Sequence, residues 1–167
     1  MSTKNESLGI HWFRRDLRIG ANRALDWSRR RHDGRVLGIF SFDQKFLARE
    51  DFSKNRFAFF LESLLALKKE LQEAGSDLLV LDQPPEKTFE WVVETSKKHN
   101  RSITISWNRD YEPFARARDE RIENILTRHS IEIRQERDHL LIEPHELTKD
   151  SGGYYQVYGA FKKKWFE

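Results

Sequence analysis

The chain has 167 residues, of which 38% are hydrophobic and 34% charged, as is typical of one globular domain with a heavily charged surface. The net charge of +3 is a weak argument for a polyanionic partner, and the absence of cysteine excludes disulfides, thiolate metal sites and a thiol nucleophile. Residues 1–7 are polar and predict a disordered tail without a signal peptide, and no apolar run could span a bilayer, so we expect a cytoplasmic protein.

Apolar runs alternate with helical patterns along the chain. In order, we expect a strand at 8–13, a helix at 21–32, a strand at 35–42, a polar loop at 43–51, a helix at 55–74, a strand at 77–81, a helix at 86–98, a strand at 102–107, a helix at 113–129 and a strand at 131–134. Five alternations predict an α/β fold: a doubly wound, five-stranded parallel sheet with helices on both faces (Rossmann-like), occupying residues 8–137.

The helix at 55–74 has the clearest apolar periodicity. Its repeat at three- and four-residue steps predicts one apolar stripe made by Phe57, Phe60, Leu61, Leu64, Leu65, Lys68 and Leu71. Gly75 is placed to end this helix.

Residues 138–167 differ from the rest, because they are rich in aromatics and lack a complete helix–strand unit. Two interpretations remain open for this extension. It leaves the sheet to meet another part of a protein, or it folds back over the sheet's own edge.

Three polar loops follow predicted strands, at 14–16, 41–43 and 108–112. The carboxyl ends of parallel strands meet at one edge, and open α/β sheets bind ligands there. Arginines, carboxylates and aromatics in these loops suit a planar ligand with polar edges. The alternative is that Arg14, Asp16, Arg109 and Asp110 form structural ion pairs. Structural ion pairing is the favoured interpretation for any one of these residues alone, whereas the whole cluster favours a ligand site.

The sequence lacks the common catalytic and phosphate-binding motifs. It has no G-x-G-x-x-G, no P-loop and no G-x-S-x-G elbow. Its six histidines have no metal-ligand spacing, and His11 lies inside a strand, where packing is its expected role. We therefore predict no catalytic residue and no metal site.

Five segments in register resemble the DNA photolyase/cryptochrome family, specifically its N-terminal antenna-chromophore domain. They are W-F-R-R-D-L-R (12–18), F-F-L-E-S-L-L-A-L (59–67), N-R-D-Y-E-P-F-A-R-A-R-D (108–119), D-H-L-L (138–141) and G-G-Y-Y-Q-V-Y-G-A-F (152–161). The resemblance covers nearly the whole chain in the family's order.

The resemblance implies a domain that binds a light-harvesting pigment and passes excitation to FAD. In this family FAD, the catalysis and most of the DNA-binding surface belong to a larger helical domain, which would be this domain's partner. Residues 138–167 would then begin the linker to it. The chain is thus expected to be part of a deoxyribodipyrimidine photolyase, a carbon–carbon lyase, and inactive alone. DNA would be bound only through the full-length protein, and no membrane would be involved.

The resemblance also suggests which residues form the pigment pocket. The candidates are Arg14, Asp16, Phe40, Ser41, Phe42, Arg56, Asn108, Asp110 and Glu112. Arg14 would hold a polar ring edge or a phosphate, and Asp110 or Glu112 would accept hydrogen bonds from the pigment's ring.

Two departures from the family pattern bear on the pigment. Residues 113–115 read Pro-Phe-Ala, where folate-binding members carry a glutamate, so FMN or deazaflavin is favoured over methenyl-folate. Asn22 matches the family's asparagine, but Arg23 replaces a proline and residues 159–161 replace T-P-F, which suggests a divergent branch. The same domain of a cryptochrome photoreceptor and a pigment-free docking module remain alternatives.

Overall fold

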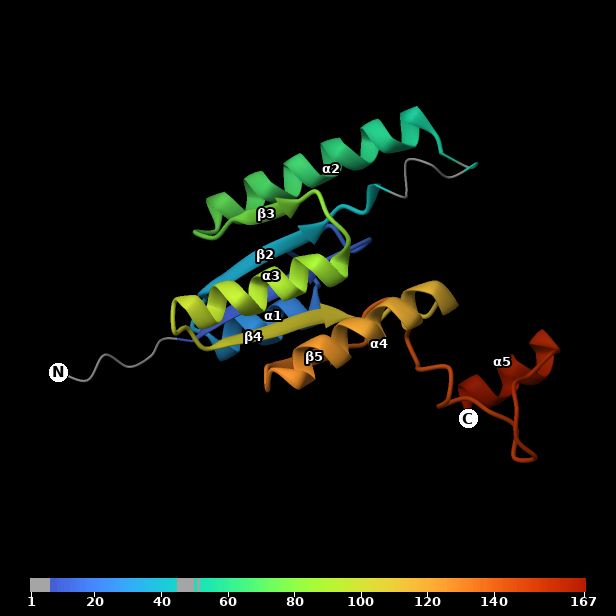
Figure 1. Cartoon of the computed structure of the whole chain (residues 1–167). Coiled ribbons are helices and arrows are strands. Elements are labelled where there is room, and N and C mark those ends of the chain that lie inside the picture. The colour runs from blue at the N-terminus through green and yellow to red at the C-terminus, as the bar shows by residue number, and fades with distance from the viewer. Residues whose placement is uncertain (1–6, 45–49, 51) are drawn as a thin grey trace.

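A five-stranded parallel sheet forms the centre of the molecule (Figure 1). The computed structural model describes residues 7–44, 50 and 52–167. The strands are β1 (Leu8–Phe13), β2 (Val36–Ser41), β3 (Leu78–Leu81), β4 (Ile103–Asn108) and β5 (Glu132–Glu136). The helices are α1 (Arg23–Arg31), α2 (Lys54–Glu73), α3 (Pro85–Lys98), α4 (Pro113–Arg128) and α5 (Tyr158–Phe166).

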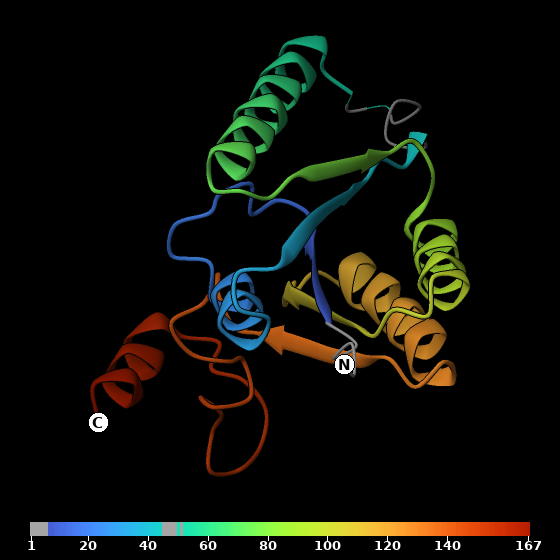
Figure 2. The ribbon, with the colours of Figure 1, turned by 90° about the vertical axis from the view of Figure 1, so that its left-hand side faces the viewer.

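The strand order is β3-β2-β1-β4-β5, so the chain reverses its direction of winding between β1 and β4. Helices α1 and α2 cover one face of the sheet, and α3 and α4 cover the other (Figure 2). The predicted doubly wound α/β fold is therefore confirmed. The fifth strand is displaced from the predicted 131–134, because pairing with β4 continues to the Asn108–Glu136 pair.

Each face of the sheet carries its own apolar core. Under α3 and α4 the core contains Trp12, Phe89, Ile105, Trp107 and Ile122 among others. Under α1 and α2 it is built around Phe13, Leu25, Leu67, Leu71 and Leu78. Both faces of the central strands β1 and β4 are thus buried, as expected of strands in a doubly covered parallel sheet.

The stripe predicted for α2 is wrong in part. Leu64 and Leu71 are buried as expected, but Leu61 and Leu65 are exposed and Leu67 is buried in their place. Consecutive helical residues point about 100° apart, so Leu64 and Leu65 cannot both face the sheet. Among the described helices, none is long and apolar enough to cross a membrane.

The chain departs from the sheet after β5 (Figure 1). The following residues end in α5, a helix without a buried residue that the sequence did not predict. Phe161 of this helix contacts Tyr155 and Trp165, with ring centroids 6.5 and 5.4 Å apart. At the other end, the predicted tail 1–7 lies outside the described residues except for Ser7, whose Oγ lies 3.0 Å from His32 Nδ1.

Candidate functional site

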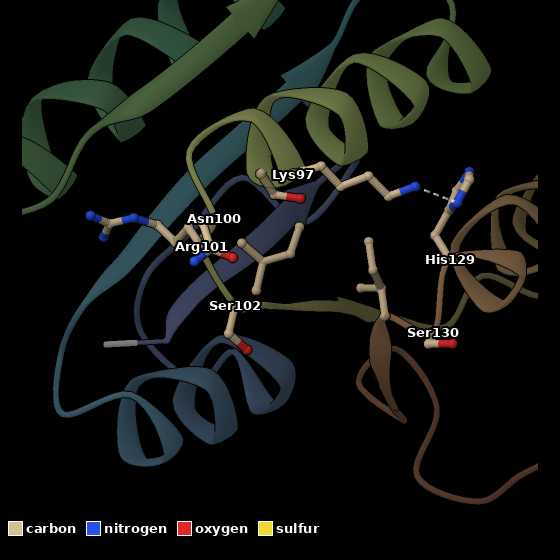
Figure 3. A pocket seen from close by; sticks show the side chains of 9 residues that line it. Lys97, Asn100, Arg101, Ser102, His129 and Ser130 are labelled. Carbon is tan, nitrogen blue, oxygen red and sulfur yellow. Dashed lines mark hydrogen bonds between the residues drawn. The ribbon is translucent and has the colours of Figure 1, made fainter. Parts of the chain in front are cut away.

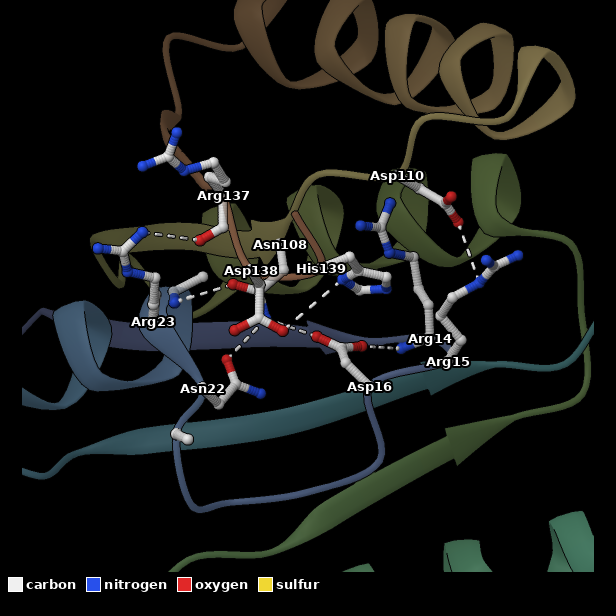
Figure 4. A network of polar contacts seen from close by, with 12 residues as sticks. Arg14, Arg15, Asp16, Asn22, Arg23, Asn108, Asp110, Arg137, Asp138 and His139 are labelled. Carbon is white, nitrogen blue, oxygen red and sulfur yellow. Dashed lines mark hydrogen bonds and ion pairs between the residues drawn. The ribbon is translucent and has the colours of Figure 1, made fainter. Parts of the chain in front are cut away.

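Asn108, at the carboxyl end of β4, is the centre of a closed polar network (Figure 4). Its side chain is fully buried. Its Nδ2 donates to Asp16 at 2.6 Å and to Asn22 at 2.8 Å, and its Oδ1 accepts from the Ala24 amide at 3.0 Å. One amide side chain thus links the turn after β1, the start of α1 and the end of β4.

Asn22 extends this network into β1 and α1. Its Oδ1 caps α1 by accepting from the Leu25 amide, and its Nδ2 donates to the Arg18 carbonyl at 3.1 Å. The same nitrogen lies 3.4 Å from His11 Nε2, while His11 Nδ1 lies 3.0 Å from Ser106 Oγ. His11 is therefore a packed strand residue with both ring nitrogens engaged.

Burial, neighbouring charge and hydrogen bonding together determine the charges in this network. Burial lowers the pKa of His11 to about 4, against the opposing field of Asp16. Burial alone would raise the pKa of Asp16, but His11 and the hydrogen bonds from Asn108 and the Arg14 amide outweigh it and hold that pKa below its usual value. At neutral pH the crevice therefore holds a neutral imidazole and a buried carboxylate.

Asp138 and His139, from the segment after β5, lie beside Asp16, Asn22 and Asn108 (Figure 4). The Asp138 carboxylate is buried and accepts a hydrogen bond from Arg18 Nη2 at 2.5 Å. Sequence reasoning missed Asp138 as part of this site. The only signal was its place at the start of D-H-L-L. The chain's own carboxylate thus lies at the crevice between β1 and β4, where a ligand was expected.

Arg14 turns inward to a different partner. Its Nη1 donates to Asp119 of α4 at 2.6 Å, and both side chains are buried. Asp119 also accepts two hydrogen bonds from Arg118. The guanidinium groups of Arg14 and Arg118 each lie 5.0 Å from the Trp12 ring centroid, so cation–π contacts hold both in place.

The outer layer of this edge contains the half-exposed Arg15 and the exposed Glu112, beside the buried Asp110. Asp110 lies 3.5 Å from Arg15, and Glu112 accepts from Arg15 at 3.0 Å on the surface. Arg109 donates to Glu143 at 2.7 Å, which ties β4 to the segment after β5. The structure thus brings together Arg14, Asp16, Asn108, Asp110 and Glu112, as expected. It also gives Arg14, Asp16, Arg109 and Asp110 the ion-pair or hydrogen-bond partners that the structural alternative requires.

The end of β2 has a different character. Here the rings of Phe40, Phe42, Phe57 and Phe60, which we call the phenylalanine shelf, lie together between β2 and the first turns of α2. Phe40 and Phe60 have ring centroids 5.3 Å apart, Phe42 and Phe57 5.6 Å, and Phe57 and Phe60 6.4 Å. Phe57 and Phe60 were placed on the apolar stripe of α2 and were not predicted as site residues. Their spacing of three residues at the start of α2 was the available signal.

The two other residues predicted near this end differ in their surroundings. Ser41 donates from its Oγ to the Gln83 carbonyl at 2.7 Å and lies 3.0 Å from Thr88 Oγ1, so its hydroxyl joins β2 to α3. Arg56 is exposed in the first turn of α2. Much of the loop predicted at 43–51, namely 45–49 and 51, lies outside the described residues.

Three cavities lie away from these residues. One of about 330 Å³ is at the amino ends of β4 and β5 (Figure 3), one of about 300 Å³ is in the segment after β5, and one of about 210 Å³ is beside α3. None of these three is lined by a predicted site residue.

The sequence profile of the DNA photolyase family matches residues 9–167. The chain belongs to the DNA photolyase family. A deoxyribodipyrimidine photo-lyase from Synechococcus sp. is 32% identical over 156 residues, which cover 93% of this chain and 31% of that protein. An uncharacterised 31.6 kDa protein from another Synechococcus strain is 34% identical, with 95% of this chain and 54% of the relative covered.

Solved structures agree with this assignment. The photolyase from Sulfolobus tokodaii, described with two FAD molecules and an implied novel light-harvesting cofactor, is 31% identical with a TM-score of 0.73. The match covers 93% of this chain and 34% of that one. A Synechocystis cryptochrome shares the fold, with a TM-score of 0.79 at 22% identity over 95% of this chain and 33% of that one. The chain spans about a third of the photolyases it matches.

Proposed function

We propose that this chain is the light-harvesting domain of a photolyase and binds a planar pigment at the carboxyl end of β2. The phenylalanine shelf is the observation that carries this proposal. Several ring faces in one place suit stacking on a flat, conjugated ring system, whereas the polar groups between β1 and β4 are already bonded to one another.

The predicted residues would have different roles in binding a pigment. Phe40 and Phe42 would stack on the ring, and the accessible Glu112 would accept from a ring N–H. Arg56 would bind an anionic group of the pigment, because a guanidinium suits phosphate and carboxylate. Arg14, Asp16 and Asn108 would hold the pocket in shape without touching the pigment. Ser41 and Asp110 would do so at its rim.

A flavin or a deazaflavin is the pigment that we favour over methenyl-folate. Residues 113–115 lack the glutamate expected of a folate site, and the similar Sulfolobus photolyase is described with two FAD molecules. The pigment would absorb blue or near-ultraviolet light. This role needs a rigid pocket rather than an acid or base, in line with the prediction of no catalytic residue.

In the whole protein, we propose that this domain supports light-driven repair of pyrimidine dimers in DNA by a carbon–carbon lyase. Its partner would be the family's helical FAD domain, through which DNA is bound. A cryptochrome is the second candidate, since Cryptochrome-1 of Aedes aegypti is 29% identical over 150 residues. Repair of dimer-containing DNA under blue light by the full-length protein would separate the two.

Fluorescence titration with FMN, FAD, a deazaflavin and methenyl-folate tests the pigment proposal. We expect a flavin or the deazaflavin to bind, and Phe42→Leu to weaken its binding about tenfold by removing a stacking face. Phe59→Leu is the matched control, because Phe59 is exposed on α2 and outside the shelf. Failure of all four compounds to bind, or equal affinity in both variants, would overturn the proposal.

A further inference from the structure

On one face of the sheet, an edge extends beyond the helices that cover that face. On the face that carries α3 and α4, Ile39 of β2 still belongs to the core under these helices, whereas β3 extends beyond α3 (Figure 2). A cavity of about 210 Å³, which we call the α3 groove, lies there. Leu37, Ile39 and Leu79 form its floor, and the half-exposed Trp91 of α3 forms its wall.

Positive charge is confined to one end of this groove. Among the described residues that line it, His99 and Arg101 are the only ionisable ones, and none is a carboxylate. The Arg101 amide is bonded to the Ser96 carbonyl at 2.9 Å, which fixes the backbone. In the part of the chain that the structure describes, the Arg101 guanidinium has no hydrogen-bond or ion-pair partner.

The Arg101 side chain is directed away from the Lys97–His129 pair of the neighbouring polar cavity, and we therefore assign it to the α3 groove. Ser96, Arg101 and Ile103 line both. Lys97 and His129 form a pair in the polar cavity, with Nζ 2.9 Å from Nδ1, and the Arg101 side chain points away from that pair (Figure 3). The groove therefore combines an apolar floor with an unpaired cation at one end.

We propose that the α3 groove binds a small amphipathic anion, with an aromatic ring or short acyl chain on Leu37, Ile39 and Leu79 and a carboxylate on Arg101. The guanidinium fork matches a carboxylate. The volume lies below the roughly 300–1,000 Å³ of sites for larger ligands. A second protein copy is disfavoured, because a stable interface buries about 800 Å² on each partner, more than so small a groove offers.

Octanoate and its neutral counterpart octanol are suitable probes, with binding followed by the NMR signal of the Trp91 indole N–H. A Trp91→Phe variant assigns this signal. We expect octanoate to shift it in a saturable way and octanol to bind about tenfold more weakly. Arg101→Gln should lower octanoate affinity about tenfold and leave octanol unchanged, because it removes one charge-assisted hydrogen bond.

Arg128→Gln is the matched control, since Arg128 is an exposed arginine at the end of α4 and outside the groove. Equal affinities for octanoate and octanol, no effect of Arg101→Gln, or shifts at Trp165 in place of Trp91 would overturn the proposal. So would a dimer in sedimentation whose formation shifts the Trp91 signal without ligand. Since α2 and its shelf lie on the opposite face, flavin titration gives an independent result.

Discussion

The crevice between β1 and β4 and the end of β2 lie at the same edge of one sheet, yet their side chains differ in polarity and in hydrogen bonding. In the crevice, Asn108 donates hydrogen bonds to both Asp16 and Asn22, and Asp138 lies beside them (Figure 4). At the end of β2, the described side chains offer aromatic rings and few polar bonds. The carboxyl edge of the sheet is favourable for ligands by topology. A ligand can therefore bind there only where the protein's own polar groups are not already hydrogen-bonded to one another.

The largest effect should come from removing the centre of the crevice. Asn108→Ala leaves Asp16, Asn22 and the Ala24 amide without their buried partner, so we expect a loss of about 3 kcal/mol or more in the free energy of unfolding. Urea denaturation measures it, with the exposed Asn55→Ala as control. A loss under about 1 kcal/mol would mean that the crevice is not a stabilising element.

Acid should weaken the same crevice. The pKa of His11 is about 4 in the folded protein and 6.5 ordinarily, so the unfolded chain takes up a proton first as the pH falls. The contribution of His11 to the free energy of unfolding is then fully present above about pH 6.5. It declines toward pH 4, by up to about 3 kcal/mol. Urea denaturation across this range should show a smaller decline in His11→Gln. An identical decline would assign the effect to other groups.

An intermediate effect is expected from Asp138→Asn. This change weakens the contact with Arg18, whose side chain is partly exposed, and should cost about 1 kcal/mol. Hydrogen exchange of residues 139–147 should become faster, because Arg18 ties this segment to the turn after β1. Unchanged exchange there would show that the segment is held without the Arg18–Asp138 contact, by others such as the Arg109–Glu143 pair.

The smallest effect should come from the accessible outer layer. Arg15→Gln removes a surface pair with Glu112 and a longer 3.5 Å contact of the half-exposed Arg15 with Asp110, and we expect it to change stability by less than about 0.5 kcal/mol. Thermal unfolding at low and high salt is the measurement. A loss as large as that of Asn108→Ala would remove the distinction between inner and outer residues.

The order of the strands and helices that form the sheet could be predicted from the sequence, because the spacing of apolar residues differs between strands and helices. It also placed Asp16 and Asn108 at one edge, since parallel strands end together. It could not show that these two bond to each other, because they are 92 positions apart and either could equally face a ligand. Asp119 and Asp138 were missed because they come from segments outside the three loops, and only packing brings them to Arg14 and Arg18.

The central position of Asn108 also constrains how the domain folds. Its partners Asp16 and Ala24 precede it by 92 and 84 residues, so the crevice closes only after β4 has docked beside β1. Contacts of such sequence separation slow folding, since a long loop must be ordered before they form. During synthesis, Asp16 and the Ala24 amide therefore lack their Asn108 partner until residue 108 is available, and Asp16 keeps only its local hydrogen bond from the Arg14 amide.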